Sequence, residues 1–340
     1  MLGTLWNNRL TRSAASRLEK GHNKLLGIRR TMRLAKSMSK VRNAAAWRMR
    51  RELYDDHVER LLAENGPVGD PAIELRDGWA VDHSRSLPHL ERLIADAQEI
   101  IRERGGVFRG GGERSFFQQI LTDEHVARYP SILDFATSNA VLAPVMRYMR
   151  TVPTLSVSKP LGVRLAESDA RLAPPDQSGY AESQLFHRDY HDDPMVYVIV
   201  ALRDVTKQSG PFSILPASAS RTVTEKLRYG ARGVPYRLTD DMVYSAVDRS
   251  ALFEFACPAG SVLFVDSSAC FHYGSRDAVI PRYLMMYAYV TVCRTDFGDL
   301  LRPECDRPVT DDSARTRRAR YPVGVNDSRL RRLVLDRQAT

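Results

Sequence analysis

The sequence predicts a mainly β fold, an antiparallel sandwich or barrel that is flanked by helices and preceded by a basic helical N-terminal extension. In the second half of the chain, short apolar segments follow one another between turn signals. No crossovers of regular helical length separate them, as a parallel βαβ sheet would require. In the first 150 residues, by contrast, apolar residues recur at helical spacing. These observations place helices first and an antiparallel β unit after them.

The composition is that of an ordinary globular protein. Of the 340 residues, 43% are hydrophobic and 27% are charged, which excludes a collagen-like, coiled-coil or wholly disordered chain. The longest apolar run, residues 196–202, is far shorter than the roughly 20 residues that a membrane-spanning helix needs. Four cysteines at scattered spacings match neither a metal knuckle nor a dense disulfide framework. We therefore expect reduced thiols and a cytoplasmic protein.

Positive charge is concentrated at the N-terminus. Residues 1–51 hold 14 lysines and arginines and one acidic residue, a net charge of +13, so the rest of the chain carries −4 of the overall +9. Apolar residues between 25 and 45 recur at helical spacing, which indicates a basic amphipathic helix. Such a helix is compatible with a mitochondrial targeting segment, with weak contact to an anionic membrane or nucleic acid, or with a solvated helix packed on the body. Mitochondria are therefore the alternative location.

Helices are predicted in the first half of the chain. Helical periodicity continues to Glu64 and is broken by Asn65-Gly66-Pro67, so we expect the basic helical extension to cover residues 1–66. A short extended segment follows at 73–81. We predict a helix over residues 86–104, which stops at Gly105-Gly106. A glycine-rich loop follows at 109–113, and two further helices are predicted within residues 130–150.

Strands are predicted from Pro153 onward, where the period of the apolar residues changes to two. A first strand, 155–165, is broken near residues 160–162. Five more candidates follow, at residues 184–189, 196–202, 212–215, 261–265 and 282–292. After residue 296 the chain is polar and arginine-rich, with a short terminal helix at 330–335. The β domain is therefore expected to span residues 67–298, and the tail residues 299–340.

The chemistry-bearing residues are His187, Asp189, His272 and Arg282. On a strand, residues two apart project to the same face, so His187 and Asp189 would stand side by side. His272 lies 85 positions downstream of His187 and follows an apolar strand. Two histidines and one carboxylate on one face are the iron ligands of non-haem Fe(II) oxygenases. Arg282, ten positions later, opens the next strand and suits a bidentate grip on a carboxylate such as that of 2-oxoglutarate.

Two alternatives to this assignment stay open. His191 and Asp193 form a second His-x-Asp triplet, although Pro194 would disturb a strand that carries Asp193. Arg276 competes with Arg282 for the carboxylate, but it lies in a loop where we expect it to pair with the adjacent Asp277.

At these residues the chain resembles the phytanoyl-CoA dioxygenase-like family of Fe(II)/2-oxoglutarate oxygenases. The resemblance rests on residues 184–189 (QLFHRD), 200–216 (VALRDVTKQSGPFSILP) and 258–266 (PAGSVLFVD), continuing to His272 and Arg282. Residues 75–81 (LRDGWAV) are similar to an early strand of the family. The resemblance covers about residues 70–295 and leaves the basic N-terminus outside.

The resemblance implies a double-stranded β-helix, the cupin-like jelly roll, with helices packed on one sheet. It implies that His187, Asp189 and His272 hold Fe(II) and that Arg282 binds the C5 carboxylate of the co-substrate 2-oxoglutarate. The expected activity is hydroxylation of an unidentified small organic substrate with dioxygen, releasing succinate and CO2. Related halogenases replace the iron-binding carboxylate by a small residue, so Asp189 favours hydroxylation or desaturation. No obligate protein partner is implied.

Two other classes of protein share parts of this pattern. A metal-binding cupin-like protein could hold zinc or iron without turning over 2-oxoglutarate, but Arg282 argues against it. A catalytically silent jelly roll could use only its basic arm, on a membrane or nucleic acid, but the complete set of three ligands argues against that.

Overall fold

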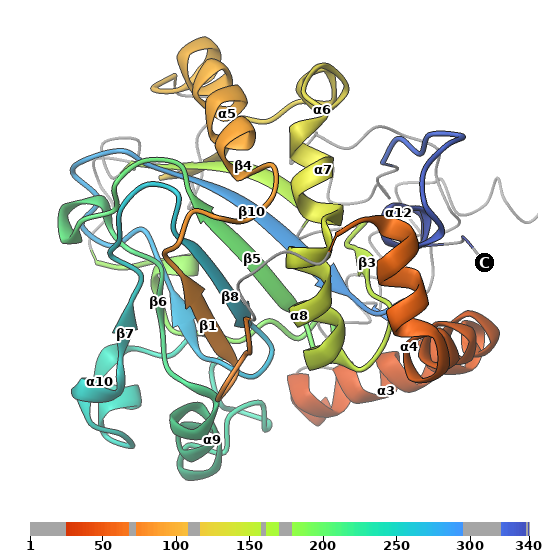
Figure 1. Ribbon diagram of the computed structural model, residues 1–340. Coiled ribbons are helices and arrows are strands. Elements are labelled where there is room, and N and C mark those ends of the chain that lie inside the picture. The colour runs from red at the N-terminus through yellow and green to blue at the C-terminus, as the bar shows by residue number, and fades with distance from the viewer. Residues whose placement is uncertain are drawn as a thin grey trace, which may run out of the picture.

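The computed structural model describes residues 25–67, 73–107, 116–157, 161–169, 179–294, 321–337 and 339. Within these ranges the strands form two antiparallel sheets, as the sequence predicts (Figure 1). The larger sheet has the order β1 (Trp79–Asp82), β8 (Val262–Asp266), β5 (Val196–Ala201), β10 (Arg282–Val290), β4 (Val163–Ser168) and β2 (Phe117–Gln119), and β3 (Thr154–Leu155) also pairs with β10. The smaller sheet has the order β7 (Phe253–Glu254), β6 (Ser213–Ile214) and β9 (His272–Tyr273). The fold is a jelly roll flanked by helices.

Side chains of alternate strand residues pack in two separate apolar cores. On β10, the side chains of Met285 and Tyr287 belong to the core beneath the helices, whereas those of Leu284 and Met286 belong to the core between the sheets. Ile214 from the smaller sheet packs in this second core. We call the helix-covered side of the larger sheet its outer face and the side that looks toward the smaller sheet its inner face.

Helices cover the outer face (Figure 1). They include α5 (Leu90–Arg104), α6 (Asp123–Arg128), α7 (Ser131–Thr137) and α8 (Asn139–Met149). The helices predicted at 86–104 and 130–150 are thereby confirmed. Tyr287 and Tyr289 of β10 reach this layer, where their hydroxyls donate to the carbonyls of Ile132 at 2.9 Å and Ala136 at 2.6 Å.

One predicted strand, 184–189, is not a regular strand. It begins with the 3₁₀ turn η2 (Glu182–Gln184), and only isolated bridges follow, Phe186 to Leu238 and His187 to His272. Gln184 explains the difference, because its side-chain amide donates to the carbonyl of Ser275 at 2.8 Å and its oxygen accepts from the backbone N–H of Ala181 at 3.1 Å. The side chain thus holds the local backbone in a turn.

The N-terminal region contains two helices, α3 (Ile28–Arg42) and α4 (Ala44–Asn65). Helix α4 contributes Leu53, Leu61 and Leu62 to the outer core and packs against α12 (Arg329–Leu335), the predicted terminal helix. Residues 1–24 of the expected extension, the loop at 109–113 and residues 299–320 of the expected tail lie outside the described residues. The domain boundaries at 66 and 298 stay predictions.

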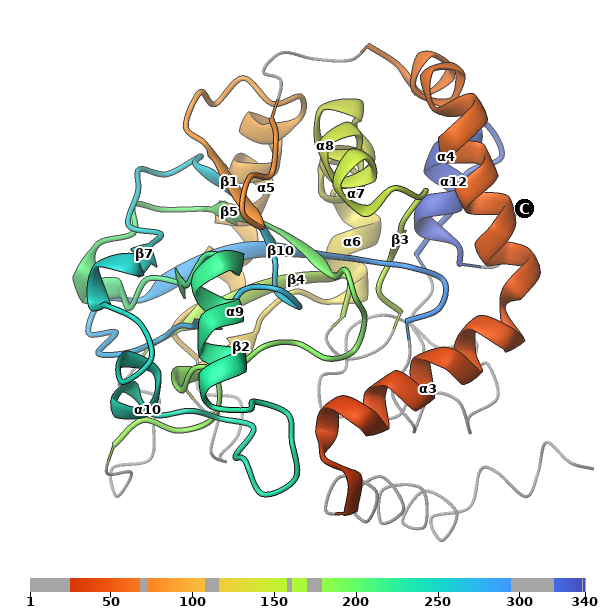
Figure 2. The same ribbon diagram turned by 90° about the horizontal axis from the view of Figure 1, so that it is seen from below.

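Helix α3 lies beside the loop that follows α9 (Ala217–Lys226), as Figure 2 shows. The backbone N–H of Arg29 donates to the carbonyl of Gly230 at 3.1 Å. Lys36 makes a 2.7 Å ion pair with Asp192, whose side chain is fully buried. Asp192 comes three residues after Asp189 in the chain, so this ion pair attaches α3 close to the segment that carries two of the predicted metal ligands.

Short helices that the sequence did not predict complete the described chain. Besides α9 they are α10 (Asp240–Tyr244), η3 (Lys207–Ser209) and η4 (Arg249–Ala251). No helix within the described ranges is both long and apolar enough to cross a membrane. Of the four cysteines, Cys257, Cys270 and Cys293 are free and buried, and Cys305 lies outside the described residues.

Candidate metal centre

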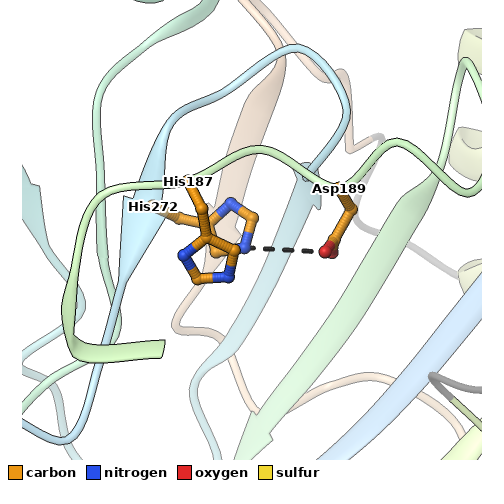
Figure 3. A group of neighbouring side chains, drawn as sticks. All are labelled: His187, Asp189 and His272. Atoms are coloured by element: carbon orange, nitrogen blue, oxygen red, sulfur yellow. Dashed lines mark ion pairs between the residues drawn. The ribbon is translucent and has the colours of Figure 1, made fainter. Parts of the chain in front are cut away.

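The fold brings together His187 and Asp189, from the segment before β5, and His272, from β9 of the smaller sheet (Figure 3). Each offers one ligand atom, and these atoms lie within 4.8 Å of one another. The two imidazole rings have centroids 4.4 Å apart, and Nε2 of His272 lies 3.8 Å from a carboxylate oxygen of Asp189. All three residues are buried. Within the described chain this is the one group of three such residues with the spacing of a metal site.

Backbone pairing fixes the two histidines side by side. The N–H of His187 donates to the carbonyl of His272 at 3.1 Å, and the N–H of His272 donates back at 2.9 Å. Each ring is then oriented by a carbonyl two residues earlier, because Nδ1 lies 2.8 Å from the oxygen of Leu185 in His187 and 3.0 Å from that of Cys270 in His272. A ring whose Nδ1–H donates in this way keeps the Nε2 lone pair for a metal.

Asp189 is positioned through the turn that follows β8. Its N–H donates to the carbonyl of Ser267 at 2.9 Å, and the N–H of Ser267 donates to the carbonyl of Met195 at 2.9 Å. Asp266 orders this turn, since one carboxylate oxygen accepts from the N–H of Ser268 at 2.9 Å and the other from the hydroxyl of Tyr148 at 2.9 Å. Sequence reasoning missed Asp266, although a carboxylate directly after an apolar strand was a readable signal.

Burial sets the charges of the three groups. Desolvation and the neighbouring His272 lower the pKa of His187 to about 3, and desolvation also lowers the pKa of His272. Burial alone would raise the pKa of Asp189, but the surrounding imidazoles of His272 and His187 lower it. At neutral pH the group therefore presents two uncharged imidazoles and one carboxylate. These are the protonation states that metal ligands require.

Arg282 lies on the inner face and is 3% exposed. Its guanidinium donates to the carbonyl of Gly210 and, at 3.1 Å, to the hydroxyl of Ser275, while Nε has no hydrogen-bond partner. Burial lowers its pKa to about 10, and no carboxylate of the described chain forms an ion pair with it. A buried cation with only neutral partners is costly, so this guanidinium is suited to an anionic ligand.

The chain segment that begins with His272 also borders Arg282. Gly274, two residues after His272, lies so close that an added Cβ would stand 3.3 Å from Nη2 of Arg282. Phe212, whose backbone borders Gly274, stacks on His272 with ring centroids 5.3 Å apart. The arginine predicted to hold a carboxylate is therefore linked to the predicted metal group by one short stretch of chain.

The two alternative assignments fare differently from the preferred one. Asp193 is exposed and does not join the metal group, so the fold does not bring the second His-x-Asp triplet together as ligands. Arg276 is stacked 3.5 Å above the centroid of the Tyr273 ring and pairs with Asp240 at 2.9 Å. Its expected pairing with Asp277 is wrong, because the carboxylate of Asp277 accepts from a tyrosine hydroxyl at 2.6 Å.

Comparisons with known proteins find similar solved structures only at low identity and at TM-scores below 0.5. No protein-family model matches the chain, and no curated protein does. Among solved structures, the epimerase SnoN in complex with Fe3+, alpha ketoglutarate and nogalamycin RO is similar at 14% identity and a TM-score of 0.46, over 79% of this chain and 96% of that one. EctD from S. alaskensis with 2-oxoglutarate and 5-hydroxyectoine matches at 13% and 0.43, over 64% and 74%. The alpha ketoglutarate-dependent carbocyclase SnoK matches at 16% and 0.42, over 69% and 90%.

Proposed function

We propose that the protein is a non-haem oxygenase that uses Fe(II) and 2-oxoglutarate to hydroxylate a small organic substrate, with release of succinate and CO2. The observation that carries the proposal is the combination of the His187, Asp189 and His272 group with Arg282, a buried guanidinium that has only neutral hydrogen-bond partners. Metal binding alone would need the first three residues. A buried cation on the same inner face, close to the chain segment of His272, is explained by a carboxylate ligand.

The donor set fits Fe(II). Two uncharged imidazoles and one carboxylate on one face leave the opposite positions of an octahedron open. Bound iron and 2-oxoglutarate would supply the oxidising power, with dioxygen as the second co-substrate. The residues of this chain hold the metal, anchor the distal carboxylate of the keto acid through Arg282, and exclude bulk water by burial.

Hydroxylation is the outcome we propose because Asp189 is present as the third ligand, which leaves no place for a halide at that position. The phytanoyl-CoA dioxygenase-like motifs around His187 and in residues 200–216 and 258–266 support the same reaction class. The substrate, in this proposal, is a small organic molecule, and no obligate protein partner takes part.

An anaerobic titration tests the proposal directly. Purified protein is loaded with one equivalent of Fe(II) and titrated with 2-oxoglutarate, and chelation gives a weak visible absorption band. Arg282→Ala should shift the 2-oxoglutarate dependence of this band, and of succinate release in air, by about tenfold or more, since it removes charge-assisted hydrogen bonds. Arg282→Lys should recover only part of the affinity, because an ammonium cannot form the planar fork.

Arg276→Ala is the matched control, because it removes the competing arginine, whose charge Asp240 already pairs. It should keep the wild-type 2-oxoglutarate dependence, with folding checked by circular dichroism. Iron binding without any 2-oxoglutarate band would instead identify a cupin-like metal protein. Wild-type dependence in Arg282→Ala, with loss in Arg276→Ala, would move the carboxylate anchor to Arg276.

The basic arm and the location of the protein are separate proposals. Helix α3 exposes Arg30, Arg33 and Lys40 together with the apolar Leu34 and Val41. We propose that this exposed side makes weak contact with an anionic surface, a membrane in preference to nucleic acid because apolar side chains accompany the charges. A cytoplasmic location is proposed, with mitochondria as the alternative.

A further inference from the structure

The inner face carries a second polar cluster, on strands β2 and β4. Phe117 and Gln119 of β2 pair in register with Ser168 and Ala166 of β4, and Arg164 lies two residues before Ala166. These residues project to the inner face, because Phe117 and Ala166 pack in the core between the sheets. The cluster lies on the larger sheet, outside the group of metal ligands.

Arg164 and Gln119 have buried hydrogen-bonding atoms without partners. Both the side-chain nitrogen and the oxygen of Gln119 are buried and have no hydrogen-bond partner, and neither has Nε of Arg164. The contacts of the Arg164 guanidinium are weak, 3.4 Å from the hydroxyl of Tyr197 and 3.9 Å from the sulfur of Met286. Leaving a buried donor or acceptor unsatisfied opposes folding, so such a pair is expected where a ligand completes it.

Aromatic side chains flank the guanidinium. Its carbon lies 5.9 Å from the centroid of the Phe117 ring and 5.7 Å from that of Tyr197. No carboxylate within the described ranges forms an ion pair with Arg164. The cluster thus combines an unneutralised cation, an amide that can donate and accept, and apolar walls.

Arg164 and Arg282 lie at different positions along the sheet. On β10, Arg282 pairs with Ser168 and Met286 pairs with Arg164, so the two arginines are four residues apart, roughly 13 Å at the rise of a strand. Tyr197, beside Arg164, comes two residues after Met195, which accepts from the Ser267 turn that also holds Asp189. Arg164 is therefore nearer the Asp189 end of the inner face than Arg282 is, whereas Gln119 and Phe117 extend the cluster toward the level of Arg282.

We propose that Arg164 and Gln119 form the subsite for the primary substrate, and that this substrate is a small organic acid with an apolar or aromatic body. Arg164 binds its carboxylate, the Gln119 amide completes the hydrogen bonds, and Phe117 and Tyr197 contact the apolar part. The oxidation of this acid rests on the proposed function, whereas its binding does not.

Carboxylates and their neutral primary amides test the subsite. The probes are benzoate, 3-phenylpropionate and octanoate, each compared with its amide by isothermal titration calorimetry under anaerobic conditions. The protein carries Fe(II) and saturating 2-oxoglutarate, so that Arg282 is occupied. At least one acid should bind the wild type about tenfold or more tightly than its amide, because only the acid forms charge-assisted hydrogen bonds. No preference for any of the three acids overturns the proposal.

Substitutions assign the preference to the cluster. Arg164→Met, which keeps the length of the side chain, should abolish the preference for the acid, Arg164→Lys should retain part of it, and Gln119→Glu should weaken acid binding by repulsion. Arg203→Met is the matched control, since Arg203 is an exposed arginine that stacks on Tyr283 of the outer face, with its guanidinium carbon 4.7 Å from the ring centroid. It should leave the preference unchanged. A preference that survives Arg164→Met in a folded protein overturns the assignment.

Two further readouts separate this proposal from the proposed function. If the wild type shows no 2-oxoglutarate band but metal-free protein still binds an acid through Arg164, the oxygenase proposal fails and the subsite stands. If Arg164→Met raises the 2-oxoglutarate concentration needed for the band as strongly as Arg282→Ala does, Arg164 belongs to the 2-oxoglutarate site and the subsite proposal is wrong.

Discussion

The two faces of the larger sheet bury polar side chains in different ways. On the outer face, the hydroxyls of Tyr283, Tyr287 and Tyr289 each reach an acceptor, Glu167 at 2.8 Å or a helix carbonyl. On the inner face, Arg282 and Arg164 each keep a buried nitrogen without a partner. Tyr283 and Arg282 are consecutive residues of one strand, so the contrast arises only from the direction in which each side chain points.

This difference separates polar groups that stabilise the fold from polar groups that await a ligand. A buried donor whose acceptor belongs to the same chain stabilises the folded protein whether or not a ligand is bound. A buried guanidinium with neutral partners opposes folding and is retained for another reason. Substitutions on the outer face should therefore change stability, and substitutions on the inner face should change binding.

The largest expected effect is loss of the metal. His187→Ala, Asp189→Ala or His272→Ala should each abolish stoichiometric Fe(II) binding, measured by elemental analysis after gel filtration, because the remaining two ligands cannot hold the ion. His191→Ala is the control and should retain most of the iron. If His191→Ala lost iron while His187→Ala kept it, the ligand set would have to be reassigned.

Arg282→Met should change 2-oxoglutarate binding without lowering the stability of the fold, and so it tests the proposed role of the inner face. Its requirement for 2-oxoglutarate should rise by about tenfold or more, whereas the free energy of unfolding in the absence of 2-oxoglutarate should not fall. The reason is that methionine relieves the desolvation of a buried cation and keeps most of its volume, which offsets the loss of the hydrogen bonds to Gly210 and Ser275. Urea denaturation of both proteins gives the free energies, and a loss of several kcal/mol would show that the guanidinium is a structural group.

Tyr287→Phe makes the opposite change on the outer face. Removing the hydroxyl leaves the buried carbonyl of Ile132 without its donor, so the free energy of unfolding should fall by about 1 to 3 kcal/mol. The 2-oxoglutarate dependence of succinate release should stay at the wild-type value. A raised requirement for 2-oxoglutarate at unchanged stability would contradict the division between the faces.

The smallest effect is expected at the surface. Replacing Arg30, Arg33 and Lys40 of α3 by glutamine should reduce retention on vesicles that contain phosphatidylserine, and the difference should disappear at high salt as the charges are screened. Succinate release should persist, since these side chains are exposed. Equal retention of both proteins would exclude the arm as the membrane-binding element, and binding of RNA alone would favour the nucleic-acid alternative.

Unlike the exposed basic residues of α3, Lys36 contacts the body of the protein. It pairs with the buried Asp192, whose other oxygen accepts from the N–H of Thr291 at 2.5 Å. Lys36→Met should leave this carboxylate partly unpaired and make α3 more sensitive to limited trypsin digestion, whereas the exposed Lys40→Met should have little effect. Equal digestion of the two variants would show that the ion pair does not hold α3 on the body.

Much of the fold was predictable because its strands carry local signals. Residues 196–202, 261–265 and 282–292 are short apolar runs between turn signals, and they appear as β5, β8 and β10. The segment 184–189 misled the same reasoning, since Gln184 bonds to Ser275, 91 positions away, and no local pattern announces such a contact. Charge counting likewise grouped Arg50 with the exposed arm, although it is buried and donates to Pro153 at 3.1 Å.

The sequence by itself determined the order of the elements and the identity of the chemistry-bearing residues, because strand periodicity and the types of metal ligands are local properties of the chain. Only the tertiary structure decided which side chains share a space. His187 and His272 meet through a two-residue bridge, and Gln119 of β2 pairs with Ala166, two residues from Arg164 on β4. Whether a buried guanidinium has an acidic partner depends on every element packed around it. That is why Arg276, neutralised by Asp240, and Arg282, left with neutral partners, look alike in sequence and differ in the folded protein.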